Sequence, residues 1–168
     1  EHGIAVHTPY IAHYFPGVSI VPIIAQSRAG MTAAFELTQT ALGSDKKILF
    51  IASIDFAHYL SAEILDRNDE ETRRMIAFPD QDIIDQMGSD FLDSSFALET
   101  YSLWHAYSGC RSQERWHQHN SRLFSGIRPE EGTSYFVYTC SASSPLRISA
   151  VGDMMLDRGV GAALERQD

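Results

Sequence analysis

Two groups of residues in this sequence carry side chains that could hold a metal ion. Glu1 and His2 open the chain, and Asp55 and His58 follow an apolar run at residues 48–53. A neutral imidazole donates a nitrogen to a borderline metal, and a carboxylate adds an oxygen and balances charge. Two histidines and one carboxylate with open positions are also the ligand type of non-haem iron sites. These residues predict a divalent metal site, with iron as the expected metal.

Simpler structural roles are also open for these residues. A histidine at a helix start, such as His2, more often faces solvent or caps the helix than binds a metal. Asp55 could hold the following turn through backbone amides. The later histidines are expected to be surface or packing residues: His105, His117 and His119.

The elements that would position the metal-binding residues alternate between helix and strand. Residues 48–53 are almost all apolar, which is typical of a strand buried on both faces of an α/β sheet. Asp55 and His58 come at its carboxyl end, the edge of open α/β sheets at which ligands bind. The pattern predicts an α/β fold in which helices cover a mixed sheet. Further strands are expected at residues 18–25, 133–140 and 146–151, and helices at 8–15, 32–42, 66–78, 81–87, 94–107 and 157–166.

Length and charge exclude several classes of function. The chain has 168 residues, a net charge of −9 and 44% apolar residues, as expected for a globular domain with a real core. The acidic balance argues against nucleic acids and anionic membranes as partners. No apolar run approaches the ~20 residues of a transmembrane helix. Two cysteines are too few for a disulfide framework. Cys110 is expected to be an ordinary turn residue, because the sequence shows no basic or metal partner for it.

The last part of the chain has the pattern of a second domain. Residues 141–145 (Ser-Ala-Ser-Ser-Pro) are the one linker-like stretch, and a new strand is expected directly after them. The chain starts without a methionine and stops inside an expected helix, so we expect it to be a fragment of a longer protein.

Several segments together resemble the Memo family, also called AmmeMemoRadiSam system protein B. Residues 1–10 are similar to a family motif with a Glu-His pair and a later Pro-aromatic pair, and residues 53–59 to a Ser-x-Asp-Phe-x-His-Tyr motif. Residues 119–121 and 133–135 fall where the family has an Asn-Ser turn and a final strand. The resemblance is collinear and makes residues 1–140 the C-terminal part of a Memo-like domain.

The resemblance implies a fold like that of the class III extradiol dioxygenases (LigB-like), whose non-haem iron lies among histidines and an acid. It makes His2 and His58 metal-site histidines, with Asp55 beside them. The family's further histidine comes from an N-terminal segment that this sequence does not contain. Some members have a cysteine near the position of Ser125, where this chain has none. The expected partners are a small-molecule ligand and other AmmeMemoRadiSam system proteins, and the expected compartment is the cytoplasm.

The end of the chain has a resemblance of its own. Residues 147–159 are similar to the opening of a CapA-type capsule-synthesis domain. Such domains resemble calcineurin-like metallophosphatases, in which an aspartate after the first strand binds a metal. Asp153 would be that ligand, or alternatively the cap of the following helix. Residues 146–168 are therefore expected to be the truncated start of a CapA-like domain.

Three functions are consistent with these residues. The first is a Memo-like domain with a metal pocket, redox-active or dioxygenase-like, fused to a CapA-like domain. The second is a non-catalytic module that binds a ligand or partner. The third is an accessory domain of a metallohydrolase of capsule or poly-γ-glutamate synthesis. Whether the chain is an enzyme stays open, because a dioxygenase-like fold does not imply that activity.

Overall fold

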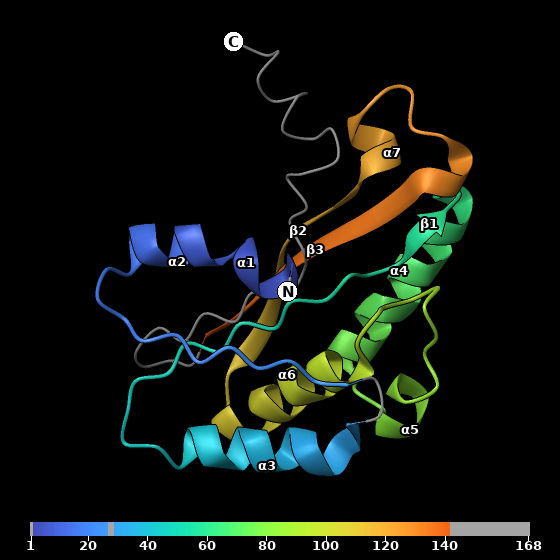
Figure 1. Ribbon diagram of the computed structural model, residues 1–168. Helices are drawn as coiled ribbons and strands as arrows, with labels where there is room; N and C mark the ends of the chain where they lie inside the picture. Colours follow the sequence, from blue (N-terminus) through green and yellow to red (C-terminus); the bar gives the residue numbers. More distant parts are fainter. Residues whose placement is uncertain (1, 27–28, 142–168) are drawn as a thin grey trace. The chain divides into compact units, whose positions relative to one another are not determined.

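Figure 1 shows the computed structural model, which describes residues 2–26 and 29–141. Contacts divide the described residues into two units, the first ending at Ile23 and the second beginning at Ile24. All but the first residue of the expected linker lies outside the described residues, as do Asp153 and the expected strand and helix of the tail. The domain boundaries near residue 141 therefore stay predictions.

The first unit contains two short helices, α1 (His2–Ala5) and α2 (Thr8–Tyr14). The helix predicted from residue 8 is confirmed. Pro9 lies in the first turn of α2, where its missing N–H costs no helical hydrogen bond. The Thr8 hydroxyl donates to the carbonyl oxygen of Ile4 at 3.0 Å and so links the two helices.

The second unit holds five helices among its described residues, and their ends follow local signals. The Asp80 and Ser94 side chains accept hydrogen bonds from backbone amides in the first turns of α5 and α6. Gly109 closes α6 in the left-handed conformation, with φ +66°. The four helices predicted at residues 32–42, 66–78, 81–87 and 94–107 are thus confirmed within a few residues, whereas α7 was not predicted. The bounds are α3 Gly30–Leu42, α4 Ala62–Ala77, α5 Gln81–Ile84, α6 Ser95–Ser108 and α7 Asn120–Leu123.

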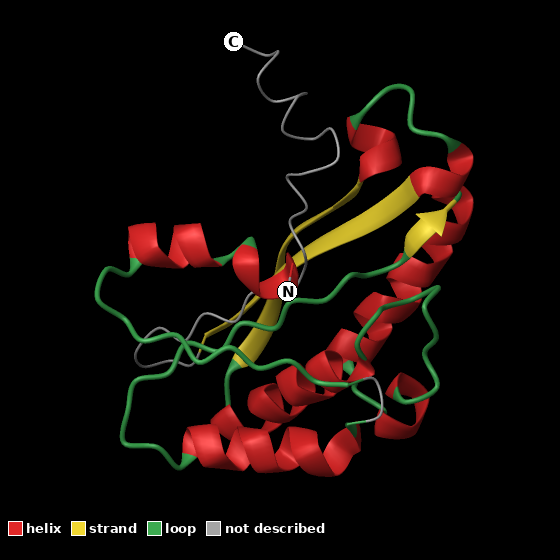
Figure 2. Cartoon of the chain, in the orientation of Figure 1, coloured by secondary structure: helices red, strands yellow, loops and turns green. Residues whose placement is uncertain are grey.

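One small sheet lies beside these helices in the described part of the chain (Figure 2). Its strands are β1 (His58–Leu60), β2 (Arg111–His119) and β3 (Gly132–Ser141), with β3 in the middle and both pairings antiparallel. The α/β class and the strand at 133–140 are confirmed. The sheet is antiparallel where a mixed one was expected. The sequence analysis missed β2 because residues 111–119 are nearly all polar or charged and show no apolar alternation.

Strands were expected at residues 18–25 and 48–53, but neither segment is a strand in the part of the chain that the structure describes. Residues 18–24 leave large apolar side chains in solvent: Val21 is 79% exposed and Ile24 68%. Pro22 lacks the amide that a ladder needs. The run at residues 48–53 was expected to form a strand, but its side chains pack without one: Ala52 is buried, and Phe50 stacks on Trp104 with ring centroids 5.5 Å apart.

The main core of the second unit holds the segment before β1 in place. Ile54 and Phe56 are at most 1% exposed, and the Phe56 ring packs edge-on against Phe136 of β3 at 4.9 Å. Helices α5 and α6 supply Ile84, Leu98 and other core residues. The side chains of alternate residues in this segment are buried in the core. The side chains of the residues between them therefore lie at the edge of the core.

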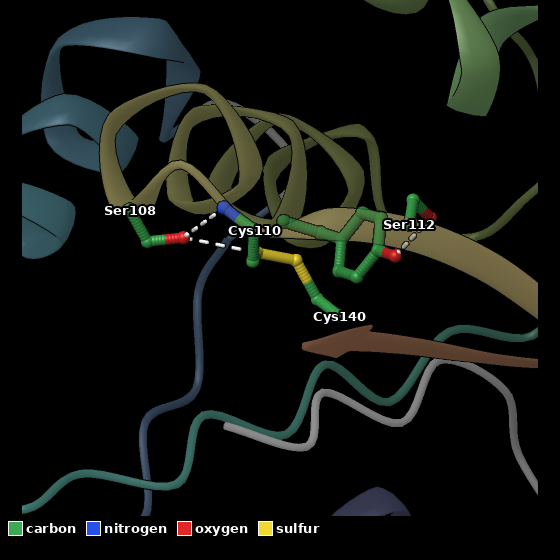
Figure 3. Close-up of a disulfide and its surroundings, with 5 residues drawn as sticks. Ser108, Cys110, Ser112 and Cys140 are labelled. Carbon is green, nitrogen blue, oxygen red and sulfur yellow. Dashed lines mark hydrogen bonds between the residues drawn. A yellow bond between two sulfur atoms is a disulfide. The ribbon is translucent and has the colours of Figure 1, made fainter. Parts of the chain in front are cut away.

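A disulfide joins the residue before β2 to the far end of β3 (Figure 3). The Cα atoms of Cys110 and Cys140 lie 5.4 Å apart, and both residues are buried. The Ser108 hydroxyl donates to Cys110 Sγ at 2.9 Å. The expectation that Cys110 is an ordinary turn residue was therefore wrong. The reason is strand register, since pairing of Ser112 with Cys140 brings the two cysteines together.

None of the helices described here is both long enough and apolar enough to cross a membrane.

Candidate functional site

Asp55 lies on the short extended segment that precedes β1, and His58 is the first residue of β1. Phe56, between them, forms an isolated bridge with Leu92, and the Ala57 carbonyl accepts a hydrogen bond from the amide of Ser134 at 2.8 Å. Asp55 and His58 are both half-buried. The segment is thus held on one side by the Leu92 loop and on the other by β3, which places both side chains at the rim of the core.

Asp93 is a second carboxylate beside Asp55. The amide of Asp55 donates to Asp93 Oδ1 at 2.9 Å, and the amide of Asp93 donates to the Asp55 carbonyl at 2.9 Å. Desolvation raises the pKa of Asp93, the negative charge of Asp55 raises it further, and the nearby His58 opposes the shift. Sequence reasoning missed Asp93 because no motif marks it, and only the loop between α5 and α6 carries it to this place.

The His58 ring has a defined orientation and a defined tautomer. Nδ1 lies 2.8 Å from the Phe56 carbonyl oxygen, which can only accept a hydrogen bond, so Nδ1 is the nitrogen that carries the proton. In the neutral ring Nε2 then holds the lone pair. A histidine fixed in this way through a backbone carbonyl is the usual arrangement of a metal-binding imidazole.

A bulge next to His58 changes the direction of the chain. His58 pairs with Thr133 and Leu60 with Gly132, so Tyr59 is an extra residue on β1. Tyr59 adopts the left-handed conformation, with φ +59°, and its side chain is 59% exposed. Bulges of this kind occur often beside active sites, where they redirect a side chain.

The turn at residues 119–121 reaches the same edge of the sheet. Asn120 Oδ1 accepts a hydrogen bond from the amide of Thr133 at 2.8 Å, and Asn120 Nδ2 donates to the carbonyl of Glu131 at 3.0 Å. Glu131 belongs to a short 3-10 helix, η1 (Pro129–Glu131). Since Thr133 is the partner of His58, two segments that the family resemblance singled out lie close to the candidate metal residue.

Two further histidines lie in carboxylate pairs between β2 and α4. His117 Nε2 lies 2.6 Å from Asp69 Oδ2, and His119 Nε2 lies 3.3 Å from Asp66 Oδ1. The His119 side chain has no exposed surface and that of His117 is 13% exposed. Surface roles for these two histidines are thus wrong, whereas packing roles are consistent with their burial. Sequence reasoning could not pair them with α4, because it did not recognise β2.

The structure places the predicted site residues in different parts of the molecule. His2 begins α1 in the first unit, whereas Asp55 and His58 lie in the second, so their convergence stays a prediction. Asp153 lies outside the described residues. Within residues 2–26 and 29–141, no group of three or more His, Cys, Asp or Glu side chains is arranged to hold a metal.

Although these three side chains are not arranged as a metal site, the donor types at Asp55, His58 and Asp93 are those that bind a divalent metal. They are one imidazole nitrogen, oriented by its hydrogen bond, and two carboxyl groups, of which the charge of Asp55 disfavours the ionisation of Asp93. A bound cation would relieve that repulsion. Nitrogen and carboxylate oxygen together suit iron, zinc or manganese better than a soft metal.

Comparisons with known proteins agree with the resemblance seen in the sequence. A family model described as "Memo-like protein" matches residues 1–93, which include both the Glu-His segment and the Asp-Phe-x-His-Tyr segment. The chain is similar to a MEMO1 family protein of Pyrobaculum aerophilum, with 38% identity over 74 residues. This match covers 42% of the chain but only 26% of the relative, so the chain spans about a quarter of that protein's length. No solved structure matches the chain.

Proposed function

The chain belongs to the Memo family, and from this premise we propose that Asp55 and His58 form part of a pocket for one divalent metal ion. The observation that carries the proposal is the hydrogen bond from His58 Nδ1 to the Phe56 carbonyl. It leaves Nε2 as the donor atom of a ring that interacts electrostatically with Asp93. Because the chain spans only a quarter of its relative, the activity of the whole protein is part of the proposal.

Each residue of the pocket has a distinct role in this proposal. His58 binds the metal through Nε2, and the Phe56 carbonyl keeps the ring in place. Asp55 supplies a carboxylate or orients a ligand, and Asp93 holds the backbone of Asp55. His2 is the further metal-site histidine that the family resemblance implies. When bound, the metal, expected to be iron, supplies Lewis-acid or redox chemistry to a small-molecule ligand.

Metal titration tests the pocket directly. Fe²⁺ binding under anaerobic conditions is measured for the chain and for His58→Ala. We expect the variant to lose at least about 10–100-fold in affinity, because one nitrogen ligand is gone. His13→Ala, which removes an exposed histidine from α2, is the matched control and should bind as the original chain does. Equal affinity in His58→Ala and the original chain would refute the pocket.

The other functions predicted from the sequence stay with this proposal as alternatives. A non-catalytic module would bind the same small ligand or a protein of the AmmeMemoRadiSam system without turnover. A capsule-synthesis function would depend on Asp153 and on residues of a CapA-like domain. The expected compartment, the cytoplasm, also stays a prediction. The buried Cys110–Cys140 disulfide argues against it, because disulfides are rare in the cytosol of mesophiles.

A further inference from the structure

A serine, a histidine and an aspartate form a hydrogen-bonded chain at the junction of β2, α7 and α4. Ser121 Oγ lies 2.5 Å from His119 Nδ1, and His119 Nε2 lies 3.3 Å from Asp66 Oδ1. The three residues come from three elements, and 53 positions separate Asp66 from His119. None of them belongs to the proposed metal pocket, so this arrangement has to be explained separately.

The chemistry of the three groups determines where the protons lie. An ionised Asp66 can only accept, so His119 Nε2 carries the ring proton. In the neutral ring Nδ1 then holds the lone pair, and the Ser121 hydroxyl donates to it. This is the order of nucleophile, general base and orienting acid that activates a serine.

A neighbouring set of the same residue types is connected differently. Ser134 Oγ donates to Asp69 Oδ2 at 2.8 Å, and His117 Nε2 lies 2.6 Å from the same oxygen. Both groups therefore bind the carboxylate, and this serine has no base. Ser134 is also only 2% exposed. Both sets contain the same three residue types. They differ in which residue the serine contacts, and only Ser121 contacts a histidine.

Burial and charge support a role for this set in chemistry. The His119 side chain has no exposed surface, which holds the ring in one orientation, whereas Ser121 is half-buried at the surface of the molecule. Arg122 donates to both oxygens of Asp66, at 2.7 and 2.6 Å. This bidentate pairing fixes the direction of the carboxylate.

We propose that Ser121 is a nucleophile for acyl transfer, with His119 as its general base and Asp66 as the positioning residue, acting on esters of small acyl groups. Ser121 Oγ attacks the acyl carbon while its proton moves to His119 Nδ1. The ester bond breaks, and the alcohol leaves with that proton. Water then attacks the acyl-serine, releases the carboxylic acid, and returns a proton through Nδ1 to Ser121.

Covalent labelling with a fluorophosphonate tests this proposal on the full chain. The probe forms an Oγ–P bond and releases fluoride, and intact mass with peptide mapping locates the adduct. We expect one adduct on Ser121 and none there in Ser121→Ala. Asp66→Asn should slow labelling by at least about tenfold, because the amide no longer holds His119 in the correct tautomer. Hydrolysis of p-nitrophenyl acetate should fall in the same order.

The controls separate this site from the fold and from the metal pocket. Ser134→Ala removes the serine bound to Asp69 and should label as fast as the original chain. Circular dichroism establishes that each variant is folded. A chelator should leave labelling unchanged, since no metal-pocket residue takes part. A folded chain that is not labelled at Ser121, or equal labelling rates with and without the Asp66 carboxylate, would overturn the proposal.

Discussion

Glu99 is a carboxyl group whose ionisation opposes folding. It lies on α6 with no exposed surface. Burial raises its pKa to about 7, with a further contribution from the neighbouring Asp85 at the end of α5. The native state therefore retains a proton on Glu99 at pH values at which the unfolded chain has released it.

This difference predicts a dependence of stability on pH. The unfolded carboxyl ionises near its ordinary pKa of 4.5 and the folded one near 7, so the contribution of Glu99 to stability is lost as pH rises through that window. Glu99→Gln should raise the free energy of unfolding at pH 8 by about 1–3 kcal/mol and change it little at pH 4. Urea melts at the two pH values measure this. An equal gain at both would show that ionisation is not the cause.

At the scale of elements, the disulfide closes the open end of the β2–β3 pair. It joins residues 30 positions apart, and the loop between them contains α7 and η1. Closing a loop of this length lowers the entropy of the unfolded chain. The antiparallel register then needs no further contact at that end to keep the two strands aligned.

Loss of the disulfide should destabilise the second unit. The double variant Cys110→Ser, Cys140→Ser is expected to lose about 2–4 kcal/mol of unfolding free energy. Dithiothreitol should lower the melting temperature of the original chain toward that of the variant and leave the variant unchanged. A melting temperature of the original chain that does not respond to reduction would contradict this prediction.

The β1–β3 contact depends on a glycine. A Cβ atom at Gly132 would overlap the Leu60 carbonyl oxygen and press on the Leu65 side chain, so β1 could not keep its position. Gly132→Ala should therefore cost about 1–3 kcal/mol and disturb His58, which lies on the same short strand. Gly88→Ala, which meets no atom within 4 Å, is the matched control. Thermal melts of both variants measure the difference, and equal melting temperatures would refute this role.

At the scale of the whole molecule, the histidines that the family resemblance implies as metal ligands lie in different units. His2 belongs to the first and His58 to the second. Family membership rests on a match that spans both, since residues 1–93 include the two motifs. Whether His2 binds the metal is therefore a separate question, because a pocket with only Asp55 and His58 would leave His2 without a role in binding.

Electron paramagnetic resonance of bound Cu²⁺ tests this requirement. Nitrogen hyperfine lines count the imidazoles on the metal, so we expect two in the original chain and one in either His2→Ala or His58→Ala. Metal–nitrogen bonds are only about 2 Å long, and both rings must therefore reach the same ion. An unchanged spectrum in His2→Ala would place His2 outside the site and leave His58 in it.

Local signals in the sequence were enough to predict most helices and the strand β3. These signals affect only residues a few positions away. They include capping residues such as Ser94, the glycine at 109 and the apolar alternation of residues 133–140. Apolar content predicted strands at residues 18–25 and 48–53, and neither is among the strands of the described residues. A strand also needs a neighbouring strand with which to pair, and that condition is not local.

The sequence by itself determined the family, the α/β class and the candidate residues Asp55 and His58, because short motifs carry that information in consecutive positions. Only the tertiary structure decided which groups meet them. Asp93 reaches Asp55 across 38 positions, His119 and Arg122 meet Asp66 across more than 50, and the two cysteines meet across 30. These contacts depend on strand register and on helix packing against the sheet. Both are set by the burial of side chains from distant segments, which no local pattern encodes.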